Sequence, residues 1–590
     1  MKKRIDNPVF CFRITYMTAK LSASFFSFLS CFCLLSFSLA AEPPSMSSQE
    51  RTEQLQRQEK SLIRRIEQEK QKPQIEEQLP PQPAPAAEST EKVLIKNIEV
   101  AGATLISEEK IQEIISPFKN KELTLGDMQK VADLITDVYR QRGFITSRAY
   151  LPPQKIEEGI LEIRVIQGRM GDVQVKGNRY FKTRLLLAKL TLKKGEYFNY
   201  NTLRRDLIKI NQSPDRLARA VLIPGKAPGE TDLILEVKDR LPIHIGLSGD
   251  NYGSRYIDKQ RYSATFTDNN LLGFDDVLNF QYQFAQAGRY FLKSVRYSLP
   301  LKAGWQVGAF GLLSRAKLGQ EFEDQDVHGK AQIYGIYATN ALVNTENLDL
   351  NLNLGFDYKD ITNYQLQTVS SQDNLRIGKV GLDMDWSDDF GGRTLLSAEV
   401  DIGIPDIMGG LKKASDTTTA SRSGAGGNFV KNTVNLLRLQ KLPFSSTLLW
   451  KNQVQISPYV LTSAEQFQIG GIANVRGYGP AEAVGDSGYY TSFEWSFPVY
   501  FIPKKLAVPF SKANFYDALR LAVFYDWATS RLRRPQSTEA KNRTLRSAGC
   551  GLRFTLPEDF SLRVDLGWPL DNTPSDSDHL HTWVQVSKDF

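Results

Sequence analysis

Alternation between apolar and polar side chains dominates the last part of the chain, residues 241–590. In residues 519–528 the odd-numbered side chains are all apolar, whereas Arg520 and Asp526 occupy the other face. Residues 560–569 repeat the pattern in the opposite phase, with apolar side chains at even numbers. A period of two residues predicts β-strands that have one apolar and one polar face. Clusters of Gly, Asn and Asp separate these runs, as expected for turns.

Such strands are compatible with a transmembrane barrel, whose apolar face contacts lipid, and with a soluble sandwich. At about 10 residues per tilted strand plus turns, residues 241–590 accommodate an antiparallel β-barrel of roughly 16 strands. The mean hydropathy is −0.34. Beyond the N-terminus, no apolar stretch approaches the roughly 20 residues that a membrane-spanning helix requires. The composition therefore excludes a helical membrane protein and leaves the barrel and the sandwich open.

The N-terminus indicates export. Basic residues precede an apolar run at 21–40, and Ser38-Leu39-Ala40 offers a small-residue cleavage site. This order predicts a secretory signal peptide at 1–41, with a retained membrane anchor as the alternative. Export, the length of the alternating region and the terminal aromatic Phe590 favour the barrel over the sandwich. We therefore expect a transmembrane β-barrel in the bacterial outer membrane, with the part of the mature chain that precedes residue 241 in the periplasm.

The number of cysteines and the net charge exclude an internal disulfide and a nucleic-acid-binding function. Cys550 is the only cysteine outside 1–41, so the mature chain cannot form an internal disulfide. The net charge of +8 falls to +4 when the five basic residues and one acidic residue of 1–41 are removed. This charge is too small to indicate nucleic-acid binding, which we exclude.

Two segments of unusual composition follow the signal peptide. Residues 42–72 contain a charged stretch that is rich in helix formers, and only Leu55, Leu62, Ile63 and Ile66 supply an apolar stripe. Such a helix cannot anchor a hydrophobic core. We expect it either to occupy a polar, confined space or to remain exposed to solvent. Residues 73–91 are rich in Pro and Ala, which predicts an extended linker. A tethered helix of this kind is an element that can move.

The chain then repeats itself with a period of 75 residues: IEVAG at 98–102 recurs as VQVKG at 173–177. Each copy is followed by two helical stretches and two strand-like runs. This order predicts two small α+β domains, at 92–168 and 169–240, each with the order β-α-α-β-β. We expect the helices to cover one face of a three-stranded sheet whose edge remains open.

Three short motifs lie at defined places in this arrangement. LPPQ at 151–154 comes late in the first repeat, NVRGY at 474–478 lies in a long loop, and FYD at 524–526 lies in a predicted strand. With these motifs and this order of segments, the chain resembles the two-partner secretion transporters (TpsB proteins). Their small periplasmic domains are called POTRA domains, and Pro152, Pro153 and Gln154 match the family's first-POTRA signature. The family's strand motif usually has Gly where this chain has Ala528.

The resemblance implies that the NVRGY loop folds back into the barrel, where Asp526 is the acidic partner of Arg476. The chemistry agrees, because the guanidinium fork matches a carboxylate and Asp526 falls on the charged, inward face. We expect Gly477 to allow a tight turn and Tyr478 to add a rigid apolar body. Glu494 also points inward by its phase. The alternative is an exposed loop Arg that has no fixed partner.

As a function, the resemblance implies export of an unfolded, haemolysin- or adhesin-like exoprotein. We expect the POTRA domains to capture it by β-augmentation, because an open sheet edge can pair with an extended chain. The helix within 42–72 would then plug the lumen. The expected partners are this exoprotein, outer-membrane lipids and, during biogenesis, the barrel-assembly machinery, and we expect a monomer. The alternatives are an outer-membrane protein-assembly factor of the same superfamily and a plain porin or enzyme barrel.

We predict no enzymatic activity, no cofactor and no metal. GDSG at 485–488 is similar to a serine-protease loop, but no suitable base accompanies it, and we interpret it as a turn. The four histidines and Cys550 show no metal-ligand spacing. The chain also lacks a Gly-rich phosphate loop and any convincing Ser/His pair for a phospholipase.

Overall fold

The computed structural model describes Gln56, Ile66, residues 73–78 and residues 91–590, with a few internal gaps. These gaps are Thr418, Thr538, Glu558, Asn572 and Thr573. The predicted signal peptide at 1–41 lies outside the described residues. So does the predicted helix at 42–72, apart from Gln56 and Ile66, which are both helical. No helix in the described part of the chain is long and apolar enough to cross a membrane.

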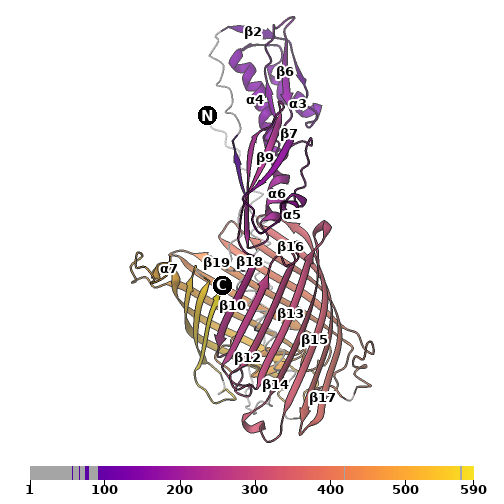
Figure 1. Cartoon of the computed structure of the whole chain (residues 1–590), viewed down its shortest axis with the longest axis vertical. Helices are drawn as coiled ribbons and strands as arrows, with labels where there is room; N and C mark the ends of the chain where they lie inside the picture. The colour runs from indigo at the N-terminus through magenta and orange to yellow at the C-terminus, as the bar shows by residue number, and fades with distance from the viewer. Residues whose placement is uncertain are drawn as a thin grey trace, which may run out of the picture.

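The predicted antiparallel barrel is confirmed, with sixteen strands in a closed ring (Figure 1). Neighbouring strands in the ring are neighbours in sequence, and β10 closes the ring by antiparallel pairing with β27. The strands are β10 (Ile243–Asp250), β11 (Arg261–Asp268), β12 (Val277–Ala285), β13 (Tyr290–Pro300), β14 (Trp305–Lys317), β15 (His328–Asn344), β16 (Leu348–Gln365), β17 (Thr368–Ser387), β18 (Gly392–Gly403), β19 (Phe429–Leu442), β20 (Ser446–Ile456), β23 (Ser487–Pro498), β24 (Leu519–Arg531), β25 (Asn542–Leu556), β26 (Phe560–Pro569) and β27 (His581–Asp589).

The alternation read from the sequence gives the barrel its two faces. On β24, Val523 and Tyr525 are 42% and 40% exposed, whereas Asp526 is completely buried. On β23, Trp495 is 46% exposed and Glu494 is 7% exposed. Because successive side chains point to opposite faces of a strand, the apolar set faces outward and the charged set faces the lumen.

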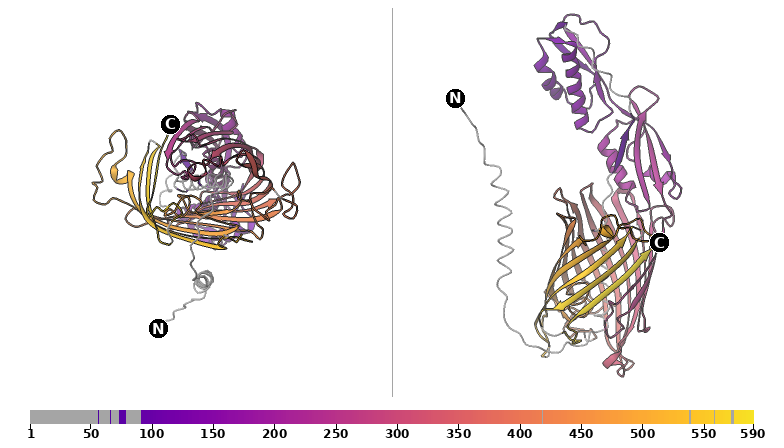
Figure 2. Two further views of the ribbon diagram at one scale, coloured as in Figure 1. Left: turned by 90° about the horizontal axis from the view of Figure 1, so that it is seen from below. Right: turned by 90° about the vertical axis from the view of Figure 1, so that its left-hand side faces the viewer.

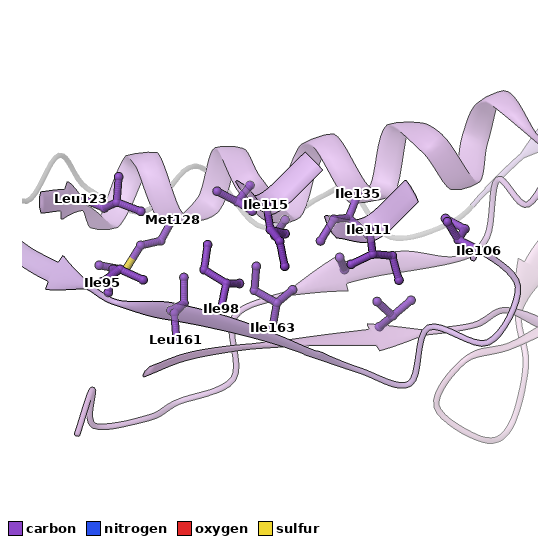
Figure 3. Packing of buried hydrophobic residues seen from close by; sticks show 14 of the residues in the cluster. Ile95, Ile98, Ile106, Ile111, Ile115, Leu123, Met128, Ile135, Leu161 and Ile163 are labelled. Atoms are coloured by element: carbon purple, nitrogen blue, oxygen red, sulfur yellow. The ribbon is translucent and has the colours of Figure 1, made fainter. Parts of the chain in front are cut away.

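Two α+β units extend from one end of the barrel, which we call the near end (Figures 1 and 2). In the first unit, β3 (Asn97–Ala101), β6 (Ile160–Ile166) and β5 (Arg148–Tyr150) form a sheet in that order. The helices α3 (Glu108–Ile115) and α4 (Leu125–Gln141) cover one face and bury Ile111, Ile115, Met128 and Ile135 against it (Figure 3). Between them lies the helical turn η1 (Ser116–Phe118), and β2 (Lys92–Ile95) pairs with β4 (Lys121–Thr124) beside this core.

The second unit contains β7 (Arg169–Lys176), α5 (Thr183–Ala188), α6 (Tyr200–Ile210), β8 (Arg216–Pro224) and β9 (Glu230–Asp239). The order of elements is the predicted one, but the edge of the sheet at β8 is not open as predicted. The strand β1 (Gln74–Glu77), from the predicted linker at 73–91, pairs in parallel with β8 and makes the sheet four-stranded. Ile75 packs against the core of this unit. A single apolar side chain that fits the core, together with backbone pairing, is enough to dock this short polar segment.

The repeat that revealed the two units ends on a glycine with a structural role in both copies. Gly102 and Gly177 have φ values of 83° and 85°, a left-handed conformation that glycine adopts without strain. A Cβ at Gly102 would lie 2.7 Å from the carbonyl oxygen of Val165, and one at Gly177 would lie 2.5 Å from that of Val237. In each unit, the glycine that ends the first strand therefore lies so close to the backbone of the last strand that a side chain does not fit there.

Ion pairs join the second unit to turns at the near end of the barrel. Arg216, whose side chain is completely buried, binds Asp275 of the β11–β12 turn, and Lys189 Nζ lies 2.6 Å from the same carboxylate. Arg204 Nε donates to Glu346 of the β15–β16 turn at 2.6 Å. Burial alone would raise the pKa of Asp275, but Arg216 and Lys189 hold it below its ordinary value. The joint is thus electrostatic and places the second unit directly over the barrel.

Candidate functional site

The loop between β20 and β23, residues 457–486, folds back into the barrel, as the resemblance implied. Residues 461–478 are buried, with the exception of Ala473. Within the loop, β21 (Phe467–Ile469) pairs with β22 (Ala483–Gly485). Apolar side chains also join the loop to the wall; they are Phe467, Ile469, Val475, Tyr478 and Ala483 from the loop and Tyr490, Ala528 and Leu545 from the strands. The loop is therefore a folded, packed part of the lumen.

Arg476 is completely buried and binds the wall through its whole guanidinium group. Its Nε and Nη2 donate to the two carboxylate oxygens of Asp526 at 2.9 and 2.7 Å. Its Nη1 donates to Glu494 at 2.6 Å, and Nη2 also reaches the Ser492 hydroxyl at 3.2 Å. The guanidinium lies 3.3 Å from the ring centroid of Phe524. We call this set the first anchor. The positive charge of Arg476 is therefore paired with carboxylates, stacked on an aromatic ring and hydrogen-bonded. A buried charge is tolerated under these conditions.

A wider charge network surrounds the first anchor on strands β23 to β26. Arg553 donates to Glu494 at 2.9 Å and to Asp565 at 2.6 Å, and Arg563 donates to Asp565 at 2.7 Å. With Arg476 and Asp526, the network holds three arginines and three carboxylates. Arg476 comes from the loop, and the other five come from the lumen face of the strands. The opposite charges of the network balance, so these paired side chains carry no net charge into the lumen.

Gly477 and Tyr478 lie where the loop touches the wall, and Gly477 has a role other than the predicted one. Its backbone is not left-handed. Instead, a Cβ at Gly477 would lie 2.7 Å from the backbone nitrogen of Pro569, so glycine permits close contact with the wall rather than a tight turn. Tyr478 is buried, and its hydroxyl accepts a hydrogen bond from the Asp571 backbone at 3.3 Å. The indole of Trp583 donates to the Arg476 carbonyl at 2.7 Å.

A second ionic contact of the same loop was not predicted from the sequence. Glu465 is completely buried and binds Lys359 Nζ at 2.7 Å and Lys431 Nζ. Lys431 also lies 2.9 Å from Asp401. We call Glu465 with Lys359 and Lys431 the second anchor. Its lysines stand on β16 and β19, whereas the carboxylates of the first anchor stand on β23 and β24. The loop is therefore bound to two separate stretches of the barrel wall, to one through an arginine and to the other through a glutamate.

The GDSG segment forms a turn between β22 and β23, and its aspartate organises the far end of the barrel. Asp486 is completely buried. It accepts hydrogen bonds from Arg422 Nη1 at 2.6 Å and from the backbone nitrogens of Leu461 and Arg533 at 2.8 and 2.6 Å. It therefore connects three loops, which explains an Asp-Ser pair without catalysis.

The signature residues of the first unit have a backbone role. The Gln154 amide accepts from the Glu162 nitrogen at 2.8 Å and donates to the Glu162 carbonyl at 2.7 Å. It thereby pairs with β6 beyond the end of β5, as a neighbouring strand would. Pro152 is half-buried and Pro153 is exposed. These residues stiffen the chain that carries Gln154 to the sheet.

The fold also brings together Asp576, Asp578 and His581 at the far end, which sequence spacing did not indicate. Their potential ligand atoms lie within 4.8 Å of one another. His581 Nε2 lies 2.9 Å from Asp576, and Lys259 Nζ lies 3.5 Å from Asp578. Each carboxylate thus already has a basic partner, and we assign no metal to this cluster.

Comparison with known proteins identifies the family. The model for haemolysin secretion/activation proteins ShlB/FhaC/HecB matches residues 229–554, and the model for the ShlB-type POTRA domain matches residues 93–168. The chain belongs to the ShlB/FhaC/HecB family. The resemblance noted from its motifs is thereby confirmed.

Relatives of this transporter share most of its length. The heme/hemopexin transporter protein HuxB of Haemophilus influenzae (strain 86-028NP) is 25% identical over 500 residues, which are 82% of this chain and 84% of HuxB. The outer membrane transporter CdiB of Escherichia coli O6:K15:H31 (strain 536 / UPEC) is 24% identical over 503 residues, 81% of this chain and 82% of CdiB. The solved structure of CdiB from Escherichia coli covers 94% of this chain with a TM-score of 0.71 at 21% identity and shows the same fold.

The chain is therefore an outer-membrane transporter that translocates a secreted exoprotein, and its two units lie in the periplasm. The near end of the barrel is the periplasmic end, and the far end faces the outside. The family is one of transporters rather than enzymes. The alternative of an outer-membrane assembly factor has less support, because the matching family model is that of the secretion proteins.

Proposed function

We propose that the transporter captures its exoprotein as an extended chain on the sheet of the second unit and passes it into the barrel below. The placement of this unit carries the proposal, since Arg216 and Arg204 bind it to turns at the periplasmic rim. By the resemblance, the exoprotein is haemolysin- or adhesin-like. The first unit, with Pro152, Pro153 and Gln154, serves as the earlier recognition domain.

The edge that an incoming strand would use is occupied by the chain itself. β1 pairs with Arg219 to Leu222 of β8, and the Gln78 nitrogen extends the pairing by donating to the Leu222 carbonyl at 2.9 Å. Backbone pairing gives β-augmentation its affinity, and β1 already makes that pairing. An exoprotein strand must therefore displace β1 before it can add to this edge.

Displacing β1 would also release the segment that precedes it. Ile66 is buried against Leu395 and Leu437, two leucines on the lumen face of β18 and β19. The Arg393 guanidinium lies 3.5 Å from the Ile66 carbonyl, and Gln56 donates to the Tyr252 carbonyl at 3.4 Å. These contacts support the proposal that the segment at 42–72 is the plug of the lumen. The linker at 73–91 then couples capture at β8 to withdrawal of the plug.

The two anchors hold the loop at 457–486 inside the same lumen, so we propose that they position it for translocation. Closure of β10 on β27 leaves the barrel without a free edge, which supports a monomeric transporter. Outer-membrane lipids surround the apolar face, and insertion by the barrel-assembly machinery completes the proposed set of partners.

Site-specific photocrosslinking in cells that secrete the exoprotein tests capture at this edge. A photoreactive residue in place of Arg219, on β8, should crosslink to the exoprotein. The matched control is Gln174, which is exposed on β7 at the other side of the same sheet. Crosslinking at Gln174 alone, or equally at both positions, would show that the β8 edge is not the capture site.

A further inference from the structure

One periplasmic connection of the barrel differs from its neighbours. Residues 499–518 join β23 to β24, whereas the two preceding periplasmic connections are the tight turns at 388–391 and 443–445. This segment includes the short helix α7 (Phe515–Ala518), and it projects sideways from the periplasmic rim, away from the axis of the barrel (Figures 1 and 2). It covers neither the lumen nor the two units. We call residues 499–518 the paddle.

The paddle is folded, although it lies outside the barrel wall. The Val508 nitrogen donates to the Ala513 carbonyl at 2.9 Å, and the Phe515 nitrogen donates to the Leu506 carbonyl at 2.9 Å. Val508 is 7% exposed. The segment therefore doubles back on itself as a small hairpin with a fixed tip.

The tip presents an aromatic side chain that stands clear of the described residues. Phe510 is fully exposed, at 108%, and its φ is 62°. A bulky residue is rarely found in this left-handed region, which costs roughly 1–2 kcal/mol. Phe501 is 87% exposed, and Phe444, at φ 59° in the adjacent turn, is 83% exposed. The backbones of Phe510 and Phe444 are strained, and their apolar rings point away from the protein. This arrangement indicates that the rings are buried in a partner outside the chain.

Charge and position identify that partner. Lys504, Lys505 and Lys512 lie among the exposed rings of the paddle, whose only acidic residue is Asp517. Exposed rings interleaved with lysines match a bilayer interface, where rings enter the headgroup region and lysines meet lipid phosphates. Lys504 Nζ lies 5.3 Å from the Tyr516 ring centroid, so a lysine and an aromatic ring are neighbours on the paddle.

The paddle also continues the lipid-facing surface of the barrel. The ring of Trp495 on β23 lies 4.9 Å from that of Phe497, and Phe497 stacks with Tyr500 at 6.2 Å. The Tyr500 hydroxyl donates to the Phe444 carbonyl at 3.1 Å. An aromatic row thus runs down the outer wall, across the rim and into the paddle, so the bilayer that covers the row meets the paddle at its periplasmic surface.

We propose that the paddle is a membrane-surface anchor that inserts Phe501 and Phe510 into the periplasmic leaflet of the outer membrane and binds anionic phospholipid through its lysines. It is the direct connection between the two strands that carry Glu494 and Asp526 of the first anchor. Lipid bound here therefore holds the periplasmic end of that wall in place.

The test uses the full-length transporter in bilayers and a fluorophore at the tip. Cys550→Ser removes the exposed native cysteine of the described chain, and Phe510→Cys then carries a bimane label. Since the Phe510 side chain is fully exposed among the described residues, the substitution does not threaten folding. The control is Glu158→Cys, which is exposed in the first unit, far from the membrane. Quenching is measured with acyl-brominated phosphatidylcholine, with and without 20% phosphatidylglycerol.

We expect brominated lipid to quench the label at 510 at least twofold more than the label at 158. Phosphatidylglycerol should increase this quenching, and replacing all three lysines with Gln should abolish the increase. Equal quenching at 510 and 158 would overturn the proposal and favour a soluble periplasmic partner for the paddle. Quenching at 510 that depends on neither phosphatidylglycerol nor the lysines would overturn the binding of anionic lipid.

Discussion

The substitution Arg476→Ala removes the first anchor and leaves its partners buried in the lumen. Asp526 is completely buried and Glu494 is 7% exposed, so neither carboxylate gains full hydration when the guanidinium is lost. Breaking a buried ion pair in this way costs about 3–5 kcal/mol. Glu494 keeps Arg553, and Asp526 keeps the hydroxyls of Ser492 and Ser547, so we expect the lower end of this range. At about 1.4 kcal/mol per tenfold change, detachment of the loop should rise roughly 100-fold.

Hydrogen exchange of the purified transporter measures this detachment directly. Peptides that cover residues 461–478 should exchange roughly 100-fold faster in Arg476→Ala than in the wild type, and secretion of the exoprotein should fall. Glu465→Gln tests the second anchor. Because Lys431 retains Asp401, we expect a smaller increase, about tenfold. Exchange in β12 and β13, away from both anchors, should stay unchanged and serves as the control for barrel folding.

Charge reversal at both positions tests whether the contact acts as a pair. Arg476→Asp with Asp526→Arg should restore part of the secretion lost in Arg476→Ala, since opposite charges again face each other. Wild-type exchange of residues 461–478 in Arg476→Ala would refute the energetic reasoning. Wild-type secretion by that variant, with a barrel that is inserted normally, would refute the functional role of the anchor.

Three further predictions concern the strand β1, the plug of the lumen and the joint between the second unit and the barrel. Ile75→Pro should disrupt the docking of β1 and tighten the binding of an extended exoprotein peptide to the transporter several-fold by fluorescence anisotropy; unchanged affinity would mean that β1 does not compete. Deleting residues 42–72 should raise single-channel conductance in planar bilayers, and Ile66→Asp should do so partially, whereas unchanged conductance would rule out the plug. Asp275, whose pKa is lowered by Arg216 and Lys189, stabilises the joint above its ordinary pKa and loses this effect as pH falls through the lowered value. The protease sensitivity of the joint should therefore increase in acid in the wild type and already be high at neutral pH in Asp275→Asn.

The barrel and the inward carboxylates could be predicted because strand periodicity is local. Because successive side chains of a strand point to opposite faces, Asp526 and Glu494 must face the lumen if their apolar neighbours face lipid. Arg476 came from a motif, and the repeat ending on Gly102 and Gly177 revealed the two units. In each case the signal lies within a few consecutive residues.

The contacts that were missed are those without a local signal. Glu465, Lys359 and Lys431 come from a loop and two strands that are far apart in sequence, and each residue alone is typical of a polar lumen. The segment of β1 is too short and polar to predict a strand, and its pairing is decided by the edge of β8. The contact role of Gly477 depends on how closely the wall approaches, which only the closed barrel determines.

The central claim, export of a dedicated exoprotein, is tested most directly by quantitative proteomics of cells that lack this chain. We expect one exoprotein to disappear from the medium and accumulate in the periplasm, while the other outer-membrane proteins keep their normal levels. Complementation with the wild-type chain should restore secretion, and complementation with Arg476→Ala should not. Depletion of many outer-membrane proteins with normal secretion would contradict the account and support the assembly-factor alternative.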